Sequence, residues 1–169
     1  INSIDESAFE YLTKLNILYI DFNNISHLPD NVFKYLTCLT KLSIWQNKIT
    51  SISPKLFSTL TNLEKLFLGH NQLSTITNYM FDTLINLIHL SLNVNKITHI
   101  EEKSFVNLIK LESLALEYNE INYLSNDLFK KLSSLKILSL HTNKIAAIPN
   151  NIFDDLVNLE YLTFSHNQI

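Results

Sequence analysis

The chain repeats itself every 24 residues, and it does so seven times without an insertion or a deletion. Each unit has apolar residues at positions 1, 4, 6, 11 and 14, asparagine at position 9, phenylalanine at position 19 and leucine at position 22. A unit this short cannot bury its own apolar face and must stack on its neighbours. The period therefore predicts one solenoid domain over residues 1–169. Its units begin at Leu15, Leu39, Leu63, Leu87, Leu111, Leu135 and Leu159.

The first half of each unit has the alternation of a short β-strand. In the third unit Leu66 and Leu68 are apolar at positions 4 and 6, and successive strand side chains point to opposite faces. Positions 3 and 5 then point away from the core. Stacked units would place their strands side by side in a parallel sheet, about 4.7 to 4.9 Å apart.

Asparagine at position 9 follows each predicted strand, where the chain turns and its backbone groups lose their sheet partners. The amide side chain can both donate and accept hydrogen bonds. We therefore expect these asparagines to form a structural ladder rather than a catalytic group. The ladder residues are Asn23, Asn47, Asn71, Asn95, Asn119, Asn143 and Asn167.

A column of phenylalanines occupies the second half of each unit, with leucine three residues further on. This spacing predicts one helical or 3₁₀ turn per unit on the side opposite the sheet. Stacked rings would make offset aromatic contacts along the solenoid. The column consists of Phe9, Phe33, Phe57, Phe81, Phe105, Phe129 and Phe153.

Two units show the complete pattern: LEKLFLGHNQLSTITNYMFDTLIN from Leu63 and LKILSLHTNKIAAIPNNIFDDLVN from Leu135. The pattern resembles the 24-residue leucine-rich repeats of Toll-like receptor ectodomains, variable lymphocyte receptors, small leucine-rich proteoglycans and certain bacterial effectors. The resemblance implies an α/β right-handed solenoid with a parallel β-sheet on its concave face and short 3₁₀ or irregular turns on its convex face. It also implies that the concave strands bind a protein partner.

Both ends of the chain fall inside a unit and neither has a polar or disulfide-bonded cap, so we expect the chain to be a piece of a longer protein. Cys38 is the only cysteine, which leaves the redox compartment open. An extracellular or exported location is slightly favoured over the cytoplasm. A lone glycosylation sequon at Asn24 adds little, because the chain is rich in asparagine.

Composition excludes several functions. With Gly69 as the only glycine, no glycine-rich phosphate loop is possible, and no zinc-protease, CxxC or serine-hydrolase motif occurs. We therefore expect no enzyme activity, cofactor or metal, since His141 and His166 alone would make a poor zinc site. The net charge is −3 and all 13 basic residues are lysine, which disfavours nucleic acid as a partner. No segment is apolar for long enough to insert into a membrane.

We call the recurring apolar, asparagine and phenylalanine positions the frame. Ligand recognition must then depend on positions 3, 5, 7 and 8, whose residues vary from unit to unit. Tyr19, Phe22, Trp45 and Phe67 fall on these positions in the first three units, beside Lys41 and Lys65. Exposed aromatic clusters of this kind often mark interfaces. Two interpretations stand: the rings contact a partner, or they pack on one another or on a cap.

A second group of variable residues gives the fifth unit an acidic edge, formed by Glu112, Glu117 and Glu120 around Tyr118. This edge would select a basic partner segment, or it is simply a solvated charge group. We predict a binding module for a protein or peptide ligand, part of a longer receptor, immune or effector protein. Substrate targeting for an attached enzyme and a structural or assembly role are the alternatives. The predicted ligand-binding residues are Tyr19, Phe22, Lys41, Trp45, Lys65, Phe67, His70, Glu117 and Tyr118.

Overall fold

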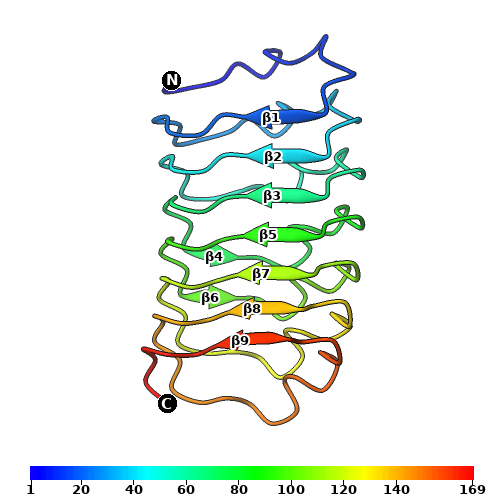
Figure 1. Cartoon of the computed structure of the whole chain (residues 1–169). Coiled ribbons are helices and arrows are strands. Elements are labelled where there is room, and N and C mark those ends of the chain that lie inside the picture. The colour runs from blue at the N-terminus through cyan, green and yellow to red at the C-terminus, as the bar shows by residue number, and fades with distance from the viewer.

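The computed structural model describes all residues from 1 to 169 and is a solenoid of stacked units (Figure 1). One strand from each unit joins a parallel sheet of seven strands, and the two termini lie at opposite ends of the stack. The strands of this sheet are, in spatial order, β1 (Ile17–Tyr19), β2 (Lys41–Ser43), β3 (Lys65–Phe67), β5 (His89–Ser91), β7 (Ser113–Ala115), β8 (Ile137–Ser139) and β9 (Tyr161–Thr163).

The register of the sheet follows the sequence period. Leu18 pairs with Leu42, Leu42 with Leu66 and Leu66 with Leu90, so each strand lies beside the residues 24 positions later. Because no unit has an insertion, every frame position forms a straight column through the molecule. The predicted parallel-sheet solenoid is confirmed.

The core lies between the sheet and the return arm, by which we mean positions 15 to 24 of each unit. Its 43 buried apolar residues form one continuous cluster, so the units share a single core. Phenylalanine rings stack in four of the six neighbouring pairs, with centroids 6.2 to 6.4 Å apart. The pairs Phe33–Phe57 and Phe105–Phe129 are not stacked in this way.

The return arm consists of turns and contains no helix. In each turn the leucine at position 22 donates its N–H to the carbonyl of the phenylalanine three residues earlier, as from Leu60 to Phe57 at 3.0 Å. These 3₁₀-type bonds do not continue into a helix, so the predicted short 3₁₀ or irregular turns are confirmed. The structure therefore has turns where the predicted α/β class implied helical elements. No helix is therefore present that has the length and apolar character to cross a membrane.

A second, two-stranded parallel sheet was not expected from the sequence. It pairs β4 (Thr75–Ile76) with β6 (His99–Ile100) and lies behind the main sheet (Figure 1). Ile76 and Ile100 are buried at position 14 of their units. In the other units the segment around position 14 forms no strand.

The position-9 asparagines connect each unit to the one before it. Asn71 donates from its Nδ2 to the carbonyl oxygens of Ile44 at 2.9 Å, Leu68 at 3.1 Å and Gly69 at 3.3 Å. Its Oδ1 accepts from the Ile49 N–H at 3.1 Å. The hydrogen bonds thus satisfy turn groups of two adjacent units, and the same pattern recurs from Asn47 to Asn143.

The residue before each ladder asparagine has a left-handed backbone conformation, although none of these residues is glycine. This conformation costs a non-glycine residue about 1 to 2 kcal/mol and is least favourable for β-branched side chains. Because this conformation recurs directly before the ladder asparagine in every unit, we infer that the hydrogen bonds of the asparagine stabilise the turn. The residues, with φ between 50° and 58°, are Phe22, Gln46, His70, Val94, Tyr118, Thr142 and His166.

A second polar column lies on the return arm at position 24, just before each new unit. Asn62 donates to the Thr37 carbonyl and Asn86 to the Thr61 carbonyl, both at 2.9 Å. We call this column the outer ladder. The first unit interrupts it, because the equivalent position there is held by Cys38, which is exposed and unpaired.

Replacing Cys38 with asparagine should stabilise the protein. By analogy with Asn62, the new amide would donate to the carbonyl of Thr13, 25 residues earlier. A hydrogen bond of this kind contributes about 0.5 to 1.5 kcal/mol, and its exposure places the gain at the lower end. Denaturant unfolding of the wild type and C38N would measure the gain. The control is Cys38→Ala, which removes the thiol without adding a donor, whereas serine at this position would itself donate, as Ser134 does to the Ile109 carbonyl. Equal stability of C38N and C38A would contradict the outer ladder as a source of stability.

Candidate functional site: the face of the sheet

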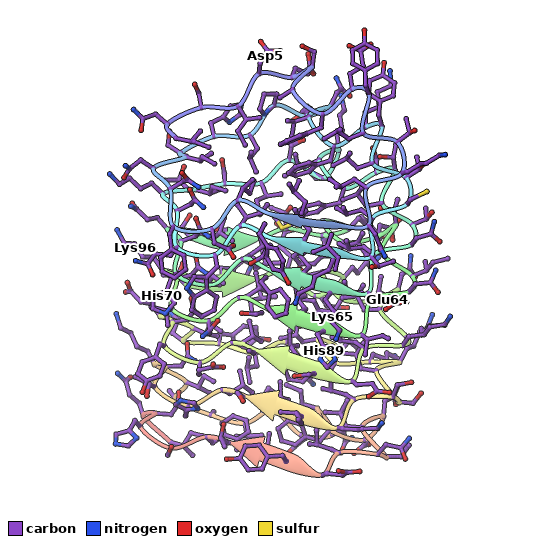
Figure 2. All side chains as sticks on the ribbon, turned by 45° about the horizontal axis from the view of Figure 1, so that its top comes forward. Asp5, Glu64, Lys65, His70, His89 and Lys96 are labelled. Atoms are coloured by element: carbon purple, nitrogen blue, oxygen red, sulfur yellow. The ribbon has the colours of Figure 1, made fainter.

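The exposed surface of the seven-stranded sheet, which we call the sheet face, carries positions 3, 5, 7 and 8 of each unit. Figure 2 shows Lys65 and His89 over neighbouring strands, with His70 on the side where the strands end. Because the strands are in register, each position forms its own column across the face. Chemically different side chains of successive units therefore lie next to one another.

A hollow of about 480 Å³ lies on this face and spans the second to fifth units. It includes five of the nine predicted ligand-binding residues, namely Lys41, Trp45, Lys65, Phe67 and Glu117. The aromatic residues from the early units and the glutamate of the fifth unit therefore line one depression. The other residues that line it are His89, Leu90, Ser91, Asn93, Ser113 and Ala115.

Trp45 forms one wall of the hollow by lying over the next unit. Its ring occupies the space above Gly69, where an added Cβ would lie 2.7 Å from Cζ3 of the indole. The ring is tilted by 38° against the imidazole of His70, with centroids 4.5 Å apart. One edge of the indole is thus packed within the protein, and the side chain as a whole is half-buried.

Lys41 connects two further aromatic residues. Its ammonium nitrogen lies 5.0 Å from the ring centroid of Tyr19 and 5.4 Å from that of Phe67, within the range of cation–π attraction. Tyr19 remains more than half exposed, while Phe67 is half-buried. The rings therefore pack on neighbouring side chains of the protein through Trp45 and Lys41, and they still present a surface. Contact with a partner stays a prediction.

The floor of the hollow is made of small side chains. Ser91, Ser113 and Ala115 follow the bulky Trp45 and Phe67 of the earlier units, so the surface drops where the side chains become short. These residues, with His89 and Asn93, occupy the variable positions of the sheet face but were not among the predicted ligand-binding residues. The available signal was the change from a large to a small residue along the position-5 column, from Phe67 to Ser91 and Ala115.

His89 lies at the edge of the hollow beside two charged neighbours. Desolvation lowers the pKa of its imidazole, the nearby Lys65 lowers it further, and Glu112 partly opposes both effects. Because the folded-state pKa is depressed below its ordinary value, His89 is mainly neutral at pH 7. The hollow therefore has two lysine charges on this side and no imidazolium charge.

The three glutamates of the predicted acidic edge have different environments. Glu112 pairs with Lys136 at 3.0 Å and Glu120 pairs with Lys144 at 2.7 Å. The bond from Lys144 lowers the pKa of Glu120. Glu117 makes no ion pair and no hydrogen bond through its side chain, and its Oε2 atom is buried. Only Glu117 of the three lines the hollow.

Two predicted ligand-binding residues lie apart from the hollow. Phe22 is 71% exposed and joins none of the aromatic pairs. Tyr118 packs edge-on against His141, with centroids 5.2 Å apart, and His141 is hydrogen-bonded to the Thr163 hydroxyl at 3.2 Å. Phe22, in the first unit, and Tyr118, in the fifth, belong to the sheet face but do not line the hollow.

Replacing Gly69 with alanine should displace the wall of the hollow. The new methyl group would collide with Asn93 Oδ1 and with the Trp45 ring, so the indole must move outward. Overpacking of this kind costs about 1 to 3 kcal/mol. Because Trp45 is the only tryptophan, a red shift of the intrinsic fluorescence of G69A would report the movement. Unchanged emission and unchanged stability would show that the indole does not lie over Gly69.

Comparison with protein-family models matches the chain to the family described as "Leucine rich repeat". The matched segments are residues 1–43, 37–87, 73–121 and 109–169, which together include every residue. The comparison with curated proteins found no match. The sequence pattern and the family model therefore agree over the whole chain.

Among solved structures, the chain is similar to TLR13 in the crystal structure of its complex with ssRNA13. The identity is 33% and the TM-score 0.91, over 96% of this chain and 24% of that one. It also resembles the Drosophila Toll–Spatzle complex, in the glycosylated form at 24% identity and TM-score 0.82, over 99% of this chain and 26% of that one. A second structure of that complex gives 23% and 0.84, with 99% and 25% covered. The Toll structures show the fold alone.

The chain spans about a quarter of the length of each of these solved chains. One of the three similar structures contains single-stranded RNA. A solenoid of this kind is thus compatible with a nucleic-acid ligand, and the exclusion of nucleic acid from composition gains no support from the comparison. It rests only on this chain's own residues.

Proposed function

Because the chain belongs to the leucine-rich repeat family, we propose that it is a protein-interaction module whose sheet face binds a protein or peptide ligand. The module serves as the recognition part of a longer receptor and has no catalytic role of its own. Its similarity to TLR13 supports a receptor-like protein exposed outside the cell or in a vesicle lumen. The family resemblance also predicts that the sheet face is concave.

The observation that carries this proposal is the hollow beside Trp45 and Phe67. Both rings are half-buried, so each is held in place by the protein while part of its surface remains free. Rigid aromatic side chains next to a depression lose little conformational freedom on binding and are frequent hot spots of interfaces. The frame residues behind them are buried and fixed, which gives a preorganised surface.

RNA is the second candidate ligand, because TLR13 was solved with ssRNA13 at 33% identity to this chain. Phosphate recognition usually relies on clustered arginine and lysine. This chain has no arginine, and its hollow contains two lysines together with the carboxylate of Glu117, which has no ion-pair partner. The charges of the hollow therefore favour a peptide.

The proposal is tested by selecting binders without bias from a phage-displayed library of random peptides. The affinity of synthetic, fluorescently labelled binders would then be measured by anisotropy for the wild type and for the double variant Trp45→Ala/Phe67→Ala. We expect the double variant to bind at least about thirtyfold more weakly, since truncating one hot-spot residue costs about 2 kcal/mol or more and the two losses are not additive.

The double variant Tyr11→Ala/Tyr123→Ala is the matched control. It removes two aromatic side chains that are 89% and 58% exposed and lie off the sheet face. It should bind normally. If W45A/F67A keeps its affinity and its melting temperature, or if a single-stranded RNA oligonucleotide binds the hollow while no peptide does, the proposed function is wrong.

A further inference from the structure

The hollow on the sheet face has opposite charges along its two edges. Lys41 and Lys65 lie in the position-3 column, where the strands begin, and Glu117 lies in the position-7 column, beyond the strand ends. Positions 3 and 7 are four residues apart, which is about 13 Å along an extended chain. The two charges are therefore too far apart to neutralise each other directly.

Glu117 is the unusual member of this arrangement. Its Oε2 is buried, yet the side chain accepts no hydrogen bond and has no cation within ion-pair distance. Buried carboxylate oxygens are normally paired, because an unpaired one loses its hydration without compensation. The neighbouring acids Glu112 and Glu120 already have their lysines. No side chain of the protein supplies a cation or a donor to Glu117, and its half-buried carboxylate lines the hollow.

Asn93, in the preceding unit, adds a directional group beside this carboxylate. Its Oδ1 accepts from the Ser91 hydroxyl at 2.6 Å, which fixes the orientation of the amide. The amide nitrogen then has two donors and no acceptor within the protein. Such a group is suited to a backbone carbonyl of an extended ligand. Trp45 and Phe67, on the other side of the floor, offer apolar surface to the next ligand residue.

We propose that Glu117 binds a lysine or arginine side chain of a partner peptide segment, with an apolar residue of the same segment against Trp45 and Phe67. This inference rests on the proposed function and specifies its ligand. The same carboxylate repels phosphate groups, so RNA would not bind in this position. The basic side chain would approach the carboxylate from the hollow. Because one carboxylate oxygen is shielded from water, the attraction is screened less than in an exposed ion pair.

The test uses the peptides obtained from the unbiased library selection on the wild-type protein. We expect them to share a lysine or arginine next to an apolar residue. A synthetic member without tryptophan would be titrated against the protein, with the emission of Trp45 as the signal. Replacing its basic residue with the neutral isostere citrulline or norleucine should weaken binding to the wild type about tenfold or more.

Variants of the protein separate this ion pair from other effects. Glu117→Gln should bind the basic peptide about tenfold more weakly and should not distinguish it from the neutral peptide. Glu117→Lys should instead prefer a peptide with glutamate at that position. The control Glu120→Gln removes an acid of the same unit that is already paired with Lys144, and it should bind like the wild type.

The outcomes distinguish this inference from the proposed function. If binding needs Trp45 and Phe67 but the peptides lack a basic residue, or E117Q binds them normally, the role of Glu117 is wrong and the interaction module stands. If no peptide binds, or binding ignores Trp45 and Phe67, both are wrong. The citrulline comparison uses only the wild-type protein, so equal binding of the basic and neutral peptides would overturn the role of Glu117 even if a Glu117 variant fails to fold.

Discussion

Replacing Asn71 with leucine should lower the free energy of unfolding by about 3 to 5 kcal/mol, although the two side chains have similar volumes. The Ile49 N–H loses the only group to which it donates, because Asn71 Oδ1 is its one hydrogen-bond acceptor. The carbonyls of Ile44 and Leu68 each lose one of their two donors. The unpaired N–H costs about 1 to 3 kcal/mol, and each hydrogen bond lost at a carbonyl that keeps another donor costs about 0.5 to 1.5 kcal/mol. The left-handed turn at His70 also loses the bonds that hold it.

The matched control is Asn62→Leu, which makes the same substitution one turn away in the outer ladder. Asn62 is exposed and makes one side-chain hydrogen bond, to the Thr37 carbonyl. Its replacement should cost about 1 kcal/mol or less, because water can take over the free carbonyl. Urea unfolding followed by circular dichroism would give both values. Equal losses for N71L and N62L would contradict the account of the inner ladder.

Replacing Phe81 with alanine should also cost about 3 to 5 kcal/mol, because it leaves a cavity in the core. The ring is 1% exposed and lies between two others, with centroids 6.2 Å from both Phe57 and Phe105. Its removal takes away dispersion contacts on both faces. In a stack of units the damage should spread to the nearest neighbours rather than remain in one unit.

Hydrogen exchange would locate this effect as well as measure it. In F81A the amides of the units that contain Phe57, Phe81 and Phe105 should lose protection, while those around Phe33 should lose less, since Phe33 and Phe57 do not stack. The control is Phe22→Ala, which removes a ring that is 71% exposed and should leave stability within about 0.5 kcal/mol. Uniform loss of protection along the whole chain would contradict the account.

Much of the fold could be predicted because the period itself encodes it. Leu66, Leu68, Asn71 and Phe81 recur at fixed spacing, and a parallel register is the arrangement in which every such column aligns. The short sheet of β4 and β6 was missed, since nothing in residues 75–76 distinguishes them from other extended segments. The left-handed residues were missed for another reason: Val94 and Thr142 are poor candidates for that conformation by local preference, and hydrogen bonds of the next residue impose it.

The candidate site was less predictable, because it depends on contacts between units. The sequence places Trp45 and Phe67 on the sheet face, but it does not show that the indole lies over Gly69 and against His70. Glu117 could have been distinguished from Glu112 and Glu120, because the residues 24 positions later are Lys136 and Lys144 for those two glutamates but His141 for Glu117. Binding by the selected residues remains a prediction for the experiments above.

Chemical-shift mapping by NMR tests the central claim most directly, namely that the frame carries stability while the free positions of the second to fifth units carry recognition. A peptide selected on the wild type would be titrated into ¹⁵N-labelled protein, with the Trp45 indole N–H as an internal reporter. We expect the largest shifts at Trp45, Phe67, Ser91, Ala115 and Glu117. Shifts concentrated on the return arm, or at the two ends of the stack, with the Trp45 indole signal unmoved, would contradict the account.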